Sequence, residues 1–172
     1  MTLMTQTTQT THEWITRLAD DERKRDAVRS GEVEASARKA ALVQRHGRAL
    51  VDRLRVAVTA DIDAFRAQFP GDAARDVTIE GGADGGFLVR KPGYPVVSLS
   101  VAPRWAAASV DCHYRLSTAD GLPAREDRFA LVFVPDGHDS AQFKHLESGL
   151  LFADADALSE YLLTPVFTGR TR

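Results

Sequence analysis

The spacing of apolar residues divides the chain into a helical first part and a strand-rich second part. From about Glu32 to Phe69, apolar residues recur at steps of three and four, which is typical of an amphipathic helix. Pro70-Gly71 should end this helix, because proline disfavours helical geometry in the preceding residue and donates no backbone hydrogen bond. The positions that carry the pattern are Val43, Leu50, Leu54, Val58, Ile62, Phe65 and Phe69.

An upstream helix is predicted to begin at about His12. Thr10 and Glu13 have the spacing of a capping box, which would satisfy free amides at a helix start. Two interpretations are open at Ser30-Gly31: the glycine breaks the helix and gives a helical hairpin, or one long rod continues through it. We favour a break. The apolar residues of this upstream helix form a short stripe of Trp14, Ile15 and Leu18.

After Pro70-Gly71 the apolar period changes to two, which predicts half-buried strands. Glycine-containing turns separate the strands at the short spacings of hairpins, so we expect an antiparallel meander. Residues 142–145 and 150–152 are expected to add a short sixth strand. A final helix should begin at Asp154 or Asp156 and close at Pro165. The five main strands are centred on Val77–Ile79, Phe87–Val89, Val97–Val101, Val110–Leu116 and Phe129–Phe133.

These elements predict an α+β fold. A long N-terminal helix or helical hairpin packs on a five- to six-stranded antiparallel meander sheet, and a short C-terminal helix follows. We expect residues 1–11 to be a disordered tail and residues 12–172 to be a single domain, with a helical part at 12–69 and the sheet and last helix at 72–167.

The predicted helix is too long for the predicted sheet. At about 1.5 Å per residue, roughly 38 residues span about 57 Å. Five strands of about seven residues give a slab of roughly 24 Å by 23 Å. We therefore expect the upstream helix, or the same helices of a second chain, to cover the overhang, and we expect a homodimer. The residues expected to carry self-association are Trp14, Ile15, Leu18, Val43 and Leu50.

Composition excludes several functional classes. The 22 basic and 24 acidic side chains give a formal charge of −2, which supplies no broad field for nucleic acid. A single cysteine, Cys112, excludes an intramolecular disulfide and a multi-cysteine metal site. No run approaches the roughly 18 apolar residues of a membrane helix. We expect a soluble cytoplasmic protein without cofactor, metal or membrane partner.

The candidate functional side chains lie on the predicted strand that contains Cys112. Asp111, His113 and Arg115 alternate with Cys112, so they share the opposite sheet face, where Arg128 of the next strand could join them. They form either a ligand-binding floor or a solvated face with cross-strand ion pairs. The alternation also separates Cys112 from His113, so a cysteine–histidine pair is not expected.

The segment Asp136-Gly137-His138-Asp139 has metal-ligating residue types, but it is predicted to be a turn because further ligands are lacking. No complete catalytic group can be assembled from the sequence. We therefore favour a noncatalytic protein-interaction or adaptor module that self-associates through its N-terminal helices. The alternative is a small-ligand-binding protein or an enzyme that uses the polar sheet face.

Overall fold

The computed structural model describes residues 7–170, with side chains described from His12 onward. The chain divides into two compact units, one ending at Arg38 and the other beginning at Lys39. The fold is α+β, as predicted: a long N-terminal helix, an antiparallel meander sheet and a short C-terminal helix.

Helix α1 (Thr7–Leu42) continues through Ser30 and Gly31, so the predicted break is wrong. Glycine costs a helix interior about 1 kcal/mol relative to alanine. Four i,i+3 ion pairs precede Gly31, and at about 0.2–0.5 kcal/mol each they offset a similar amount. The helix also begins five residues before His12, so Thr10 lies inside it and is not its N-cap. Residues 1–6 of the predicted tail lie outside the described residues.

A π-helical segment (Val43–Gly47) and helix α2 (Arg48–Ala67) follow directly along the chain. Of the apolar positions predicted for this helix, Leu54, Val58 and Ile62 are buried, and Leu50 and Phe65 pack partly against the core. Phe69, the last predicted position, lies beyond α2 and is 37% exposed, whereas Val51, which the pattern did not include, is buried. Helix α2 ends at Ala67, just before the predicted Pro70-Gly71 stop.

The sheet has seven strands that pair in chain order, each antiparallel to the next, and it curves into a half-barrel. The structure has more strands than the five to six that the sequence predicts. The difference arises because residues 142–145 and 150–152 belong to two separate strands and not to one. The strands are β1 (Thr78–Gly81), β2 (Phe87–Lys91), β3 (Val96–Arg104), β4 (Ser109–Ser117), β5 (Arg125–Pro135), β6 (Ala141–His145) and β7 (Leu151–Phe152). Short 3-10 turns lie at Ala73–Arg75, Ala83–Gly85 and Trp105–Ala107.

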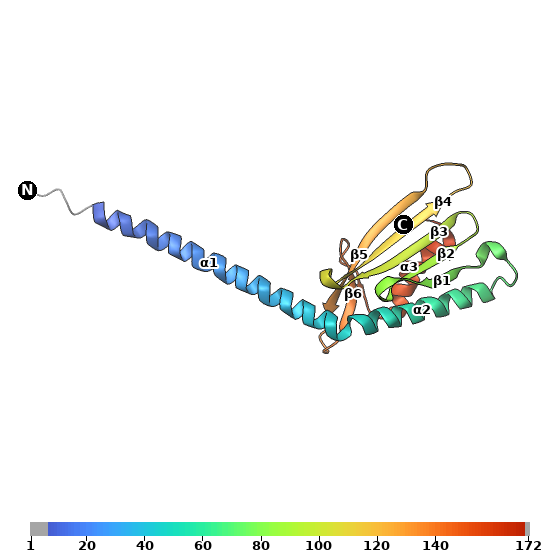
Figure 1. Cartoon of the computed structure of the whole chain (residues 1–172), viewed down its shortest axis with the longest axis horizontal. Coiled ribbons are helices and arrows are strands. Elements are labelled where there is room, and N and C mark those ends of the chain that lie inside the picture. The colour runs from blue at the N-terminus through green and yellow to red at the C-terminus, as the bar shows by residue number, and fades with distance from the viewer. Residues whose placement is uncertain (1–6, 171–172) are drawn as a thin grey trace, which may run out of the picture. The chain divides into compact units, whose positions relative to one another are not determined.

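Helices α2 and α3 (Ala155–Thr168) pack against the same face of the sheet (Figure 1). Ser159 of α3 donates a hydrogen bond to Asp61 of α2 at 2.6 Å. The rings of Phe65 and Phe167 stack with centroids 4.0 Å apart. The apolar face of the sheet is thus covered by helices of its own chain, and its polar face lies on the other side.

Helix α3 begins at Asp154, whose side chain accepts a hydrogen bond from the backbone N–H of Ala157 at 2.8 Å. The predicted stop at Pro165 is wrong, because the helix continues to Thr168. Val166 is buried in the core, and Gly169 ends the helix in a left-handed conformation while donating to the Pro165 carbonyl. Packing and this C-cap together extend the helix past the proline.

Candidate functional site

The polar sheet face predicted from the sequence is present. Strand β4 alternates as expected, with Cys112 and Tyr114 buried and Asp111 and His113 half-buried on the opposite face. The register places His113 opposite Arg128. The structure therefore brings the predicted residues onto one surface.

The charges on this face are largely paired with one another. Arg104 Nε donates to Asp111 Oδ2 at 2.9 Å. Glu126 Oε2 lies 3.1 Å from an Arg128 nitrogen, which donates to it, and 3.3 Å from His113 Nε2, a contact not aligned as a hydrogen bond. The Arg128 hydrogen bond, with a smaller effect from His113, lowers the pKa of Glu126. This arrangement is typical of a solvated antiparallel sheet face.

Cys112 offers no nucleophile. The side chain is buried in the core on the side of β4 away from His113. Burial, with a smaller effect from Asp111, raises the pKa of the thiol far above its ordinary value. A thiolate is therefore strongly disfavoured at neutral pH.

The segment from Asp136 to Asp139 forms the turn between β5 and β6. Asp136 accepts hydrogen bonds from the His138 backbone N–H at 2.9 Å and from the Ser140 hydroxyl. Asp139 pairs instead with Arg45 at 2.9 Å. Across residues 7–170, no three His, Cys, Asp or Glu side chains are grouped so that they could hold a metal ion.

A cavity of about 150 Å³ lies on the helix-covered side of the sheet, bounded by strands β3 to β6 and helix α3. Sequence reasoning missed it, because its walls come from segments that only tertiary packing brings together. A strand pattern can mark the inward face of β4 and β5, but it cannot show where α3 leaves space. The lining residues are Val97, Tyr114, Leu116, Asp127, Arg128, Phe129, His145, Glu147, Tyr161 and Pro165.

Hydrogen bonds hold two of the polar cavity residues in place. The Tyr114 hydroxyl donates to the Leu162 carbonyl of α3 at 2.7 Å. The His145 ring accepts a hydrogen bond at Nδ1 from the Ser148 N–H at 3.2 Å, which places the proton of the neutral ring on Nε2. The same ring stacks on Phe129, with centroids 4.8 Å apart. The Tyr114 and His145 side chains are therefore held by contacts within the chain.

The residues predicted to self-associate divide into two groups. Trp14, Ile15 and Leu18 are 51%, 46% and 49% exposed on α1. Val43 is only 6% exposed and belongs to the core of its own chain, against which Leu50 is also partly packed. Of the five residues predicted to self-associate, Trp14, Ile15 and Leu18 are therefore the exposed ones, and we call these three the α1 apolar patch.

Comparison of the chain with protein-family models, curated proteins and solved structures gives no match. Among the described helices, none combines the length and apolar character needed to cross a bilayer.

Proposed function

We propose that the protein is a noncatalytic interaction module that self-associates by pairing helix α1 with α1 of a second copy. The observation that carries the proposal is the α1 apolar patch. Its three large side chains are about half exposed and lie within one turn of the helix. Adjacent exposed apolar residues of this size, tryptophan above all, are typical of contact surfaces between proteins.

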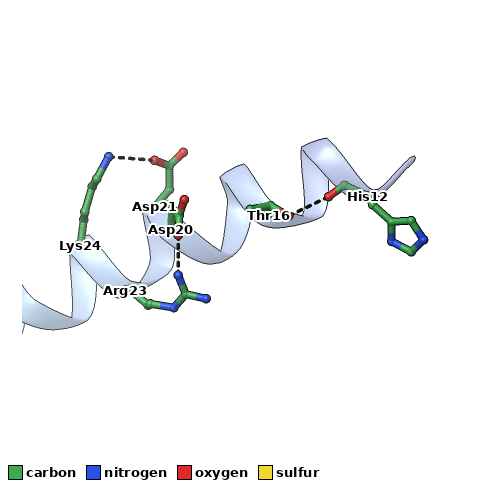
Figure 2. A network of polar contacts seen from close by, with 6 residues as sticks. All are labelled: His12, Thr16, Asp20, Asp21, Arg23 and Lys24. Carbon is green, nitrogen blue, oxygen red and sulfur yellow. Dashed lines mark hydrogen bonds and ion pairs between the residues drawn. The ribbon is translucent and has the colours of Figure 1, made fainter. Parts of the chain in front are cut away.

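Ion pairs between neighbouring turns stabilise the exposed middle of α1. Three acidic residues, 20–22, are followed at once by three basic residues, 23–25. Figure 2 shows Asp20 paired with Arg23 and Asp21 paired with Lys24. In the second pair the nitrogen and oxygen are 4.0 Å apart. Such pairs stabilise an isolated helix by a few tenths of a kcal/mol each. These pairs therefore favour the helical state of α1 where its side chains are exposed.

The order of these charges supports a second copy as the partner. Trp14, Leu18, Asp21, Arg25 and Val28 follow the i, i+4, i+7, i+11, i+14 spacing of a single helix face. In an antiparallel pair with its twofold axis at the level of Arg23, Asp21 of each chain lies opposite Arg25 of the other. This pairing is complementary to itself, as a twofold contact between identical chains requires.

The same register places Leu18 of each chain opposite Val28 of the other. In this register, one apolar layer of Leu18 and Val28 would lie on each side of the two central ionic layers. Polar residues in the seam of a coiled coil specify register at a cost in affinity. We therefore expect a dimer of moderate affinity, formed in roughly the micromolar range.

Sedimentation velocity of the full chain across micromolar concentrations tests the proposal. We expect a concentration-dependent dimer that the double variant Trp14→Ala/Leu18→Ala shifts to monomer. The matched control is Leu122→Ala, which removes an exposed leucine from a loop between β4 and β5, and it should leave the dimer intact. A wild-type chain that sediments as a monomer throughout this range would reject the proposal.

A further inference from the structure

The cavity beneath helix α3 has the size of a small-molecule site. Its volume is about 150 Å³, and protein cavities of about this volume accommodate benzene. Helix α3 closes it over strands β3 to β6, and the wall mixes apolar side chains with a few polar groups. Concave, largely apolar sites with a few placed polar groups are the usual form of ligand pockets.

Aromatic rings form much of the wall. Phe129 stacks on His145, and the Tyr161 ring meets Phe129 edge-on with centroids 6.0 Å apart. Tyr114 lies on the adjacent strand, its ring centroid 6.1 Å from that of Phe129. These rings brace one another, so the wall needs little reorganisation on binding. Ring faces carry partial negative charge and therefore attract cations.

The charged residues lining the cavity are predominantly acidic. Asp127 and Glu147 are exposed carboxylates that line it. Neither forms an ion pair with another residue in the described part of the chain. Arg128 also lines the cavity, but its guanidinium donates to Glu126 at 3.1 Å. Two carboxylates thus remain without an opposite charge, and this favours a positively charged ligand.

From this combination we propose that the cavity binds a small organic ammonium ion with an apolar body about the size of one benzene ring. The body lies against Tyr114, Phe129 and Tyr161, and the ammonium group lies at Asp127 and Glu147. An anionic ligand of the same size would meet the two carboxylates of the cavity lining. The inference goes beyond the proposed function, because every residue it uses lies outside α1.

An NMR titration of the full chain at neutral pH tests the ligand class with three probes of similar shape: benzylamine, benzyl alcohol and benzoate. Benzylamine should shift backbone amides of β4, β5 and α3 with a dissociation constant in roughly the millimolar range, given its about eight heavy atoms. Benzyl alcohol should bind about fivefold more weakly, and benzoate more weakly still. Equal binding of all three, tighter binding of benzoate, or no shift with any probe would overturn the proposal.

A double variant tests whether the cavity recognises the charge of the ligand and not only its shape. Asp127→Asn/Glu147→Gln should weaken benzylamine binding about fivefold while leaving benzyl alcohol binding unchanged. Both substitutions are nearly isosteric and lie at exposed positions, so the fold should be retained. The control is Glu80→Gln, an exposed carboxylate on β1 that does not line the cavity. Unchanged benzylamine affinity in the double variant would overturn the assignment to a cation.

Discussion

The Tyr114 hydroxyl donates a hydrogen bond to the backbone carbonyl of Leu162, with 2.7 Å between the oxygens. It ties the central strand β4 to helix α3 at the wall of the cavity. Both residues are buried, so this hydrogen bond is formed away from water, where losing a partner is costly.

Tyr114→Phe should lower the free energy of unfolding by about 1–2 kcal/mol, because it removes a buried hydrogen bond while keeping the ring. Urea denaturation followed by circular dichroism measures the change. Tyr94→Phe is the matched control, since Tyr94 is an exposed tyrosine and should change stability little. Equal effects of the two substitutions would show that the Tyr114 bond does not contribute.

Cys112 should be unreactive in the native protein. Burial raises the pKa of its thiol, so both access and ionisation are suppressed. A thiol-reactive chromogenic disulfide should label Cys112 only after denaturant unfolds the chain. Rapid labelling of one thiol per chain under native conditions would contradict the buried position.

The ion pairs of the polar face predict a pH dependence. The hydrogen bond from Arg128 lowers the folded-state pKa of Glu126 below its ordinary value of 4.5. A carboxyl group with a lowered folded pKa stabilises the fold above its unfolded pKa. We therefore expect this contribution at neutral pH and its loss as the pH falls below about 4.5 through the folded pKa.

Arg128→Ala should raise the pKa of Glu126, which NMR titration of its side-chain carboxyl carbon measures directly. Arg115→Ala is the control. Arg115 lies opposite Glu126 in the strand register, yet no ion pair joins them among the described residues. A larger pKa change in the Arg115 variant would contradict the pairing of Glu126 with Arg128.

Gly31→Ala tests the continuity of helix α1. Gly31 lies inside the helix, and a Cβ added to it would meet nothing within 4 Å. Alanine should therefore stabilise this part of the helix by about 1 kcal/mol. In far-ultraviolet circular dichroism, the variant should show a larger helical signal or a higher melting temperature than the wild type. A loss of helical signal would instead indicate a break at this position.

Much of the fold follows from local patterns in the sequence. The three- and four-residue steps in α2 reflect burial on the sheet, and the alternation in β4 separates Cys112 from His113. Prediction fails where a local signal is opposed by other contacts. Gly31 suggests a helix end, yet α1 continues through it next to a series of ion pairs. Pro165 also suggests a helix end, yet core contacts extend α3 to Thr168.

The candidate sites divide in the same way. The polar face of Asp111, His113 and Arg128 could be predicted, because neighbouring strands of a meander lie side by side. The cavity could not, since it depends on how α3 sits over the sheet. Tyr161 and Val97 line it together although they are far apart in the sequence. Periodicity shows which face is buried, but it does not show where the packing leaves space.

The central claim, antiparallel pairing of α1 between two chains, is tested most directly by site-specific cross-linking. Asp21 and Val28 lie on one helix face, seven residues apart. With the axis at Arg23, the two copies of residue 21 are separated by about 6 Å along the helix axis and the two copies of residue 28 by about 15 Å. A short bis-maleimide should therefore join Asp21→Cys chains efficiently and Val28→Cys chains poorly. Equal cross-linking of both variants would indicate parallel pairing, absence of cross-linking in both would indicate no pairing, and either result would contradict the account.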